Sequence, residues 1–290
     1  MHMTQRQGNR HLVSSILLLA ACISLLQACS GASIFPSKPP APIDFARTIE
    51  YADRAALVYE STETIEARNT ADHRYETSPL DALGGKVFLE TDDARHLQWI
   101  AVRGTANLNN IKLDVDYNKV VDERLRIPLH KGFADLAMDA YRFVKPRLKQ
   151  GYEVRVTGHS LGGAAAVIVL MLLKEDGATL GQAVTFGQPK VTNRAGVRKY
   201  QELPLLRVIN DKDPVPLLPP LELFAILDEG SFRHLGPEVV LEDGAAFRYY
   251  NGHDAERMSV MSFWQHMSDH DVPDHYMKNY LDRLHQKLLP

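Results

Sequence analysis

The sequence has only two cysteines, Cys22 and Cys29, and both stand near its N-terminus. No disulfide can form inside the rest of the chain, so its fold must be held by its core alone. Charge of neither sign dominates, since 33 lysines and arginines stand against 36 aspartates and glutamates, a formal net charge of -3. Such a balance produces no positive electrostatic field that would attract nucleic acid, so a nucleic-acid partner is not expected. No spacing of cysteines and histidines suggests a metal site, and neither a metal nor a cofactor is expected.

A long apolar run is also missing. The run LVSSILLLAACISLL, residues 12–26, is too short and too close to the start for a membrane span. It follows Arg6 and Arg10 with no acidic residue between, which is the pattern of an export signal. We therefore expect the protein to be exported.

The end of this signal, Leu26-Gln27-Ala28-Cys29, resembles a bacterial lipobox, in which the cysteine is lipidated and becomes the first mature residue. Residues 1–28 would then be a lipoprotein-type signal peptide, and a lipid on Cys29 would anchor the protein to a membrane, with the bacterial outer membrane as the expected location. A competing box ends at Cys22, but cleavage there would leave the apolar ISLLQ on the mature chain. A plain secretory signal also stays open.

Residues 29–43 are rich in proline and serine and read as a semi-rigid tether. One domain is expected over residues 44–290, beginning with a helix over residues 44–60. Strand-like and helical segments then alternate, which predicts an α/β fold with a mostly parallel sheet covered by helices on both faces. The expected strands are KVFLE, LQWIAVRG, YEVRVTG, QAVTFG and LLRVIN, and the expected helices cover residues 130–151, 160–176 and 193–203, with a hairpin over 231–250 and two final helices.

The stretch VTGHSLGGAAA places Ser160 between Gly158 and Gly162, directly after a strand and at the start of an apolar helix. In this setting a sharp elbow presents a nucleophilic serine above the edge of the sheet. The glycines suit such a turn because it brings backbone against backbone and leaves no room for a Cβ.

A serine needs a base and an acid that orients the base, and in this fold both follow the serine along the chain. His275 stands on the loop before the last helix and is the first choice for the base, with His270 next. Asp211 and Asp213 both follow the strand LLRVIN, at the edge where ligands bind in open α/β sheets. Periodicity does not choose between these two acids.

Several motifs occur in the order found in class 3 lipases, the family of the filamentous-fungal triacylglycerol lipases within the α/β-hydrolases. The chain resembles this family over roughly residues 44 to 290, in the segments 101–105 (AVRGT), 130–133 (HKGF), 158–164 (GHSLGGA), 185–191 (TFGQPKV), 213–216 (DPVP) and 274–281 (DHYMKNYL). The resemblance implies an α/β-hydrolase fold and selects Asp213 as the acid, with Ser160 as nucleophile and His275 as base. It also implies an oxyanion hole at Thr105 and at the N–H of Leu161.

The implied activity is hydrolysis of carboxylic esters of the lipase type. The expected substrate is a lipid, either a triacylglycerol or a phospholipid cut by phospholipase A1 action, or a shorter acyl ester such as those of feruloyl-type esterases. A non-catalytic envelope protein and an acyltransferase with the same triad are the alternatives. Residues 106–115 stand where the family has a lid but lack the tryptophan often found there, so both a working lid and an ordinary surface loop stay open. The apolar residues 217–227 are expected to line an acyl pocket, to touch lipid or to form a buried helix or strand. The sequence does not indicate an oligomeric state.

Overall fold

The structure, a computed structural model, describes residues 36–104, 118–219, 230–252 and 273–289. Within these residues one large sheet has eight strands in the order β1-β2-β3-β6-β7-β8-β9-β10. The strands are β1 (His73–Pro79), β2 (Lys86–Asp92), β3 (Leu97–Arg103), β6 (Glu153–His159), β7 (Leu180–Phe186), β8 (Leu205–Asn210), β9 (Glu238–Leu241) and β10 (Phe247–Tyr250).

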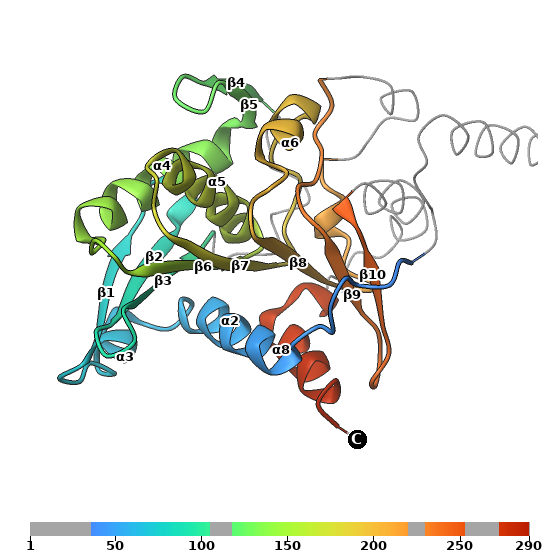
Figure 1. The fold of residues 1–290 in the computed structure, drawn as a ribbon, viewed down its shortest axis with the longest axis horizontal. Helices are drawn as coiled ribbons and strands as arrows, with labels where there is room; N and C mark the ends of the chain where they lie inside the picture. The colour runs from blue at the N-terminus through green and yellow to red at the C-terminus, as the bar shows by residue number, and fades with distance from the viewer. Residues whose placement is uncertain (1–35, 105–117, 220–229, 253–272, 290) are drawn as a thin grey trace, which may run out of the picture.

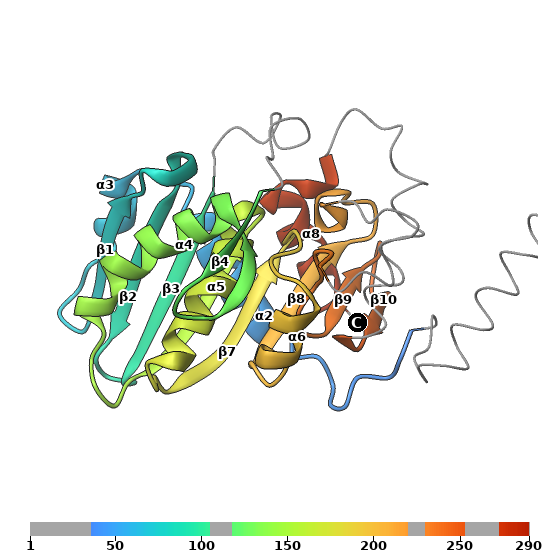
Figure 2. The ribbon, with the colours of Figure 1, turned by 90° about the horizontal axis from the view of Figure 1, so that it is seen from above.

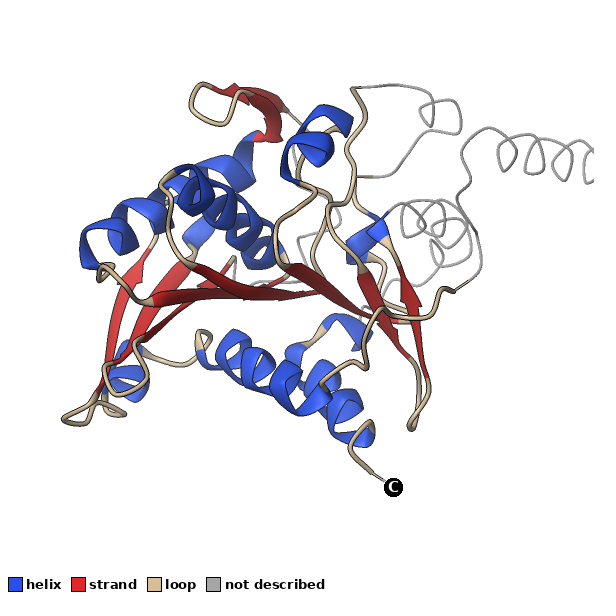
Figure 3. Ribbon diagram, viewed as in Figure 1, coloured by secondary structure: helices blue, strands red, loops and turns tan. Residues whose placement is uncertain are grey.

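The five strands from β3 to β9 are parallel, and antiparallel strands stand at both edges of the sheet. Helices cover both faces, as Figures 1 and 3 show. One face carries α4 (Lys131–Val144), α5 (Leu161–Glu175) and α6 (Arg194–Tyr200), and the other carries α2 (Phe45–Leu57) and α8 (Met277–Gln286). The predicted α/β-hydrolase architecture with a mostly parallel sheet is confirmed.

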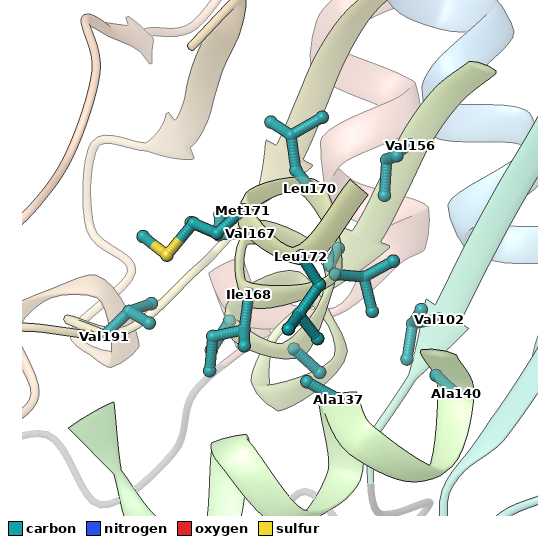
Figure 4. Close-up of a cluster of buried hydrophobic side chains, with 14 of the residues drawn as sticks. Val102, Ala137, Ala140, Val156, Val167, Ile168, Leu170, Met171, Leu172 and Val191 are labelled. Atoms are coloured by element: carbon teal, nitrogen blue, oxygen red, sulfur yellow. The ribbon is translucent and has the colours of Figure 1, made fainter. Parts of the chain in front are cut away.

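Helix α5 is the centre of the larger core. It is apolar on every side, and each residue from Leu161 to Leu173 is buried. A helix of this kind has no face for water and must be enclosed by protein. Figure 4 shows it between α4, at Ala137 and Ala140, and the sheet, at Val102 and Val156. The alanines at the start of α5 keep its first turns close to the strands, which fixes the position of its N-terminus at the sheet edge.

The opposite face has its own core, formed by α2 and α8. The ring of Tyr51 on α2 packs edge-to-face on Trp99 of β3, with centroids 4.6 Å apart. Helix α2 begins after Asp44, whose carboxylate accepts the N–H of Arg47 as an N-cap. Helix α2, near the start of the described chain, and helix α8, at its end, therefore lie together on one face of the sheet.

Several elements differ from the sequence-based expectation. Strand β1 was not predicted, nor were α3 (Thr62–Glu66) and the small antiparallel pair of β4 (Lys119–Asp122) and β5 (Ile127–His130). The helix expected to close near Gly151 ends at Val144, and a 3-10 turn over Lys145–Arg147 follows. Pro146 explains the early end, because proline cannot donate the hydrogen bond that would continue an α-helix.

The predicted hairpin is present as β9 and β10, and of the two final helices the structure describes α8. The other final helix, the export signal and residues 106–115 lie outside the described residues, as do residues 220–227 of the apolar stretch. The end of the proline-rich segment lies along the sheet, where the N–H of Ser37 donates to the carbonyl of Tyr249 at 2.8 Å. No helix in the described part of the chain is long and apolar enough to cross a membrane.

Candidate active site

The sequence-predicted residues Ser160, Asp213 and His275 come from three separate parts of the chain. Ser160 follows β6, Asp213 stands in the loop after β8, and His275 ends a 3-10 turn, Pro273–His275, just before α8. Strands β6, β7 and β8 are parallel neighbours, so their C-terminal ends lie together at one edge of the sheet, which Figure 2 shows from above. This is the edge at which open α/β sheets bind ligands.

Ser160 stands in a strained turn between β6 and α5. Its backbone has φ 57° and ψ -132°, a conformation that residues with a side chain rarely adopt. The turn is this sharp because α5 meets the strands without intervening side chains: a Cβ on Gly162 would lie 2.2 Å from the carbonyl oxygen of Val102. A Cβ on Gly158 would in turn lie 2.5 Å from the carbonyl oxygen of Gly162. The steric role predicted for the two glycines agrees with this geometry.

The side chain of Ser160 does not serve the helix that it precedes. Serine at an N-cap position normally accepts a hydrogen bond from the first turn, but here no such bond forms. Ser160 is only 1 % exposed, and its Oγ makes no hydrogen bond to any described residue. The main chain of Ser160 is held by β7, because its N–H donates to the carbonyl of Phe186 at 2.9 Å.

Leu161 is the first residue of α5. The first N–H groups of a helix have no acceptor within the helix, and they stand at its partly positive end. The N–H of Leu161 is thus suited to bind a negative oxygen beside Ser160. The other predicted oxyanion residue, Thr105, lies outside the described residues, next to Gly104 at the end of β3.

Asp213 is buried, with 4 % of its surface exposed, and its carboxylate accepts hydrogen bonds from three groups. The N–H of Val215 donates to Oδ1 at 2.9 Å, and the Tyr280 hydroxyl and His275 Nδ1 donate to Oδ2 at 2.5 Å and 2.7 Å. These donors compensate the carboxylate for the loss of water. The carboxylate therefore has a fixed orientation toward the imidazole.

His275 is also buried, at 1 % exposure. Its Nδ1 must carry the proton that Asp213 accepts, which leaves the lone pair of the neutral ring on Nε2. Nε2 is buried and has no hydrogen-bond partner among the described residues. The imidazole is thus oriented so that Nε2, to which no described residue is bonded, can accept a proton.

Tyr280 on α8 reinforces this arrangement. Burial, followed by the charge of Asp213, raises the pKa of Tyr280 well above its usual value, so its hydroxyl keeps its proton and stays a donor. The backbone N–H of Asn210 donates to the same hydroxyl oxygen at 3.2 Å. Tyr280 therefore joins the end of β8 to the acid, a role that the resemblance alone did not assign.

The structure distinguishes the two aspartates that the strand pattern left open. Asp211 points outward and forms an ion pair with Arg248 on β10, whereas Asp213 faces His275. The bond from the N–H of Val215 to Asp213 Oδ1 also makes Asp213 the first residue of an Asx-type turn. Asp213 is thus both a turn residue and the partner of the histidine.

Of the other histidines after β8, the two that the structure describes have partners away from Asp213. His234 is buried and bonds to the carbonyl of Pro216 at 2.7 Å, while His285 lies on the exposed side of α8 and bonds within its own helix. His270, the second choice for the base, lies outside the described residues together with His253 and His266. No group of ligating side chains in the described ranges could hold a metal ion.

Gly187 is a site residue whose role sequence reasoning missed. It follows β7 with φ 56°, and a Cβ there would lie 2.9 Å from both the Asp213 carboxylate and the His275 ring. Only glycine leaves room for this pair of side chains at the end of β7. The signal was present in the motif at 185–191, but a close approach to residues 26 and 88 positions later cannot be read from sequence.

Comparison with known proteins agrees with this geometry. A family model described as lipase (class 3) matches residues 99–223, a range that includes Ser160 and Asp213. A secreted mono- and diacylglycerol lipase from Fusarium solani is 30% identical over 173 residues, covering 57% of this chain and 50% of that protein. A lipase from Rhizomucor miehei is 29% identical over 184 residues, covering 59% of this chain and 47% of that protein. The chain thus spans about half the length of these curated relatives.

The fold is also shared with a solved lipase structure. The crystal structure of a lipase from Rhizopus microsporus var. chinensis superimposes with a TM-score of 0.66 at 23% identity, covering 86% of this chain and 96% of that one. The segment that the family model matches, residues 99–223, includes strand β6, the turn at Ser160 and the loop that carries Asp213. Residues 99–223 of the chain thus match the class 3 lipase family, and the chain shares its α/β-hydrolase fold with a solved lipase.

Proposed function

We propose that this protein is a serine carboxylic ester hydrolase of the lipase type, with Ser160 as nucleophile, His275 as base and Asp213 as the orienting acid. One observation carries the proposal. The buried Ser160 Oγ and His275 Nε2 lack partners among the described residues, while both carboxylate oxygens of Asp213 and Nδ1 of His275 are hydrogen-bonded. Unpaired buried polar atoms are costly, and they persist where a reaction needs them.

The first half of the reaction forms an acyl-enzyme. Ser160 Oγ attacks the ester carbonyl carbon while His275 Nε2 takes the hydroxyl proton, and Asp213 stabilises the charge that this gives the imidazole. The carbonyl oxygen becomes negative and is bound by the N–H of Leu161, together with Thr105. When the tetrahedral intermediate collapses, the ester C–O bond breaks and His275 returns the proton to the departing alcohol.

The second half releases the acid. Water enters in place of the alcohol and gives a proton to His275 Nε2 as its oxygen attacks the acyl carbon. Collapse breaks the bond to Ser160 Oγ, which recovers its proton from His275. No group beyond these side chains, the oxyanion donors and water is needed.

The proposed substrates are acyl esters of glycerol. The support is the family, together with relatives whose names describe lipases and a mono- and diacylglycerol lipase. Phospholipids and shorter esters use the same chemistry at the carbonyl and differ only in the groups around it.

Ester hydrolysis should depend on Ser160. We expect the purified chain to hydrolyse p-nitrophenyl esters and Ser160→Ala to lose at least about 10⁴-fold in kcat, because no other group supplies the nucleophile. The measurement is the initial rate over a series from butyrate to palmitate, with monoacylglycerol, triacylglycerol and phosphatidylcholine emulsions beside it. Unchanged thermal unfolding in the variant excludes loss of fold, and equal rates in both proteins would contradict the proposal.

Substitution of the two aspartates should have very different effects on kcat. In Asp213→Asn the bond to His275 Nδ1 no longer favours the required tautomer, and we expect kcat to fall about 10³- to 10⁴-fold. Asp211→Asn is the matched control: it removes an exposed pair with Arg248 and should change kcat by less than about twofold. Steady-state kinetics of both variants test this. A similar loss in the two, or the larger loss in Asp211→Asn, would remove Asp213 from its proposed role.

We also propose that the protein is exported and that Cys29 carries the lipid that holds it at a membrane. The basic start, the apolar run and the box Leu26–Cys29 support this proposal. The name of the Fusarium solani relative describes that protein as secreted, which agrees with export but not with any particular anchor. A lipid-anchored hydrolase would act on esters at the membrane surface.

Processing should follow Cys29 and not Cys22. In a bacterial host we expect the mature chain to begin at an acylated Cys29, and Cys29→Ser to remain as the full-length precursor. Cys22→Ser is the matched control and should be processed like the unaltered protein. Mass spectrometry of the N-terminal peptide and partition into detergent measure this. Acylation that persists in Cys29→Ser, or disappears in Cys22→Ser, would contradict the assignment.

A further inference from the structure

His159, the residue before the nucleophile, has no part in the mechanism above, yet it is buried directly beside the site. Both of its ring nitrogens are hydrogen-bonded. Nε2 lies 2.6 Å from the main-chain carbonyl oxygen of His275, and Nδ1 lies 2.7 Å from the hydroxyl of Tyr59, just after the end of α2. The rings of His159 and His275 are neighbours, with centroids 4.6 Å apart.

Simple chemistry fixes the direction of these bonds. A carbonyl oxygen only accepts, so Nε2 of His159 must carry a proton. Burial, and then the neighbouring His275, hold the pKa of His159 well below its usual value, so the ring is neutral and Nδ1 is an acceptor. Burial raises the pKa of Tyr59, so the phenol keeps its proton and donates it to Nδ1. The chain therefore runs from Tyr59 through one tautomer of His159 to the His275 carbonyl.

This chain holds a different part of His275 from the part that Asp213 holds. Asp213 binds the ring at Nδ1, whereas His159 binds the main chain. His159 is also covalently joined to Ser160. The side chain of His159 is bonded to the main chain of the proposed base, and its own main chain continues into the proposed nucleophile. His159 thus connects His275 to Ser160.

Tyr59 is itself tied to the other side of the site. The guanidinium of Arg103 lies over its ring, 5.7 Å from the centroid, and the Nε of Arg103 donates to the carbonyl of Gly104 at 3.1 Å. Gly104 directly precedes Thr105. Tyr59 therefore contacts both Arg103, at the end of β3, and His159.

We propose that His159 and Tyr59 form a positioning pair, which acts through the His275 main chain to keep its Nε2 aligned with Ser160 Oγ. The proposal rests on the proposed function for its effect on turnover, but not for its effect on His275 itself. Neither residue touches the substrate. A shift of about 1 Å at a base is enough to reduce a rate strongly, so a bond to its backbone matters beyond its contribution to stability.

Three variants of the full chain test the pair. Tyr59→Phe removes only the hydroxyl, and we expect kcat to fall about three- to tenfold with KM unchanged. His159→Phe keeps an aromatic ring at this position but removes both nitrogens, and should lower kcat by about 10²-fold. His159→Gln restores an amide N–H that can reach the His275 carbonyl, and should recover most of that loss.

Tyr51→Phe is the matched control. Tyr51 is buried on α2, the helix that ends just before Tyr59, and its hydroxyl donates to the carbonyl of Gln182 at 2.8 Å, away from the site. We expect it to lower the unfolding temperature about as much as Tyr59→Phe while leaving kcat unchanged. Equal kcat losses in the two tyrosine variants, a rise in KM in place of a fall in kcat, or no recovery in His159→Gln would each overturn the proposal.

A second readout needs no substrate. Nitrogen-15 NMR of the histidine-labelled protein should show His159 as the neutral Nε2–H tautomer from about pH 5 to pH 8. The Nδ1–H signal of His275 should broaden through solvent exchange in Tyr59→Phe and His159→Phe but not in Tyr51→Phe. An unchanged signal in the first two variants would overturn the positioning role. Absence of ester hydrolysis in the unaltered protein would count against the proposed function alone, because this signal still decides the role of the pair.

Discussion

The close approach of α5 to the sheet is the constraint on which the site depends. Gly162 lies against the carbonyl of Val102, where a Cβ would be 2.2 Å away, and this contact forces the chain to turn sharply at Ser160. A residue held at φ 57° costs about 1–3 kcal/mol, and the buried helix behind it supplies the packing that keeps it there. The same turn places the N-terminus of α5 and its free N–H groups beside the serine.

The remaining site residues form around this turn as a set of buried polar groups that satisfy one another. Asp213 accepts from Val215, Tyr280 and His275, and His159 joins Tyr59 to the His275 main chain. Each side-chain nitrogen and oxygen of Asp213, Tyr280, His159 and Tyr59 has a partner in the described structure. The exceptions, Ser160 Oγ and His275 Nε2, are the two atoms between which a proton would move in acyl transfer. The geometry thus separates the groups that hold the site from the groups that react.

Local patterns in the sequence were enough to find the elbow and the central strands. Gly158, Ser160 and Gly162 stand next to one another in the chain, and buried parallel strands are continuous apolar runs. The edge strand β1, HRYETSP, is polar and half-exposed, so hydrophobic periodicity could not find it. Asp211 and Asp213 could not be separated by pattern because both follow the same strand, and the family motif was needed to choose. Tyr59, Gly187 and the side chain of His159 act through contacts with residues far along the chain, which only the folded structure brings together.

The central claim is that Ser160 is a nucleophile activated by His275, and trapping tests it most directly. A p-nitrophenyl alkylphosphonate should transfer its phosphonyl group to Ser160 Oγ and release one equivalent of p-nitrophenolate, because the phosphorus centre imitates the tetrahedral intermediate of ester cleavage. Peptide mass spectrometry should find the adduct on Ser160, and Ser160→Ala should carry none. A folded protein that hydrolyses esters but is modified at another residue, or is not modified at all, would contradict the account.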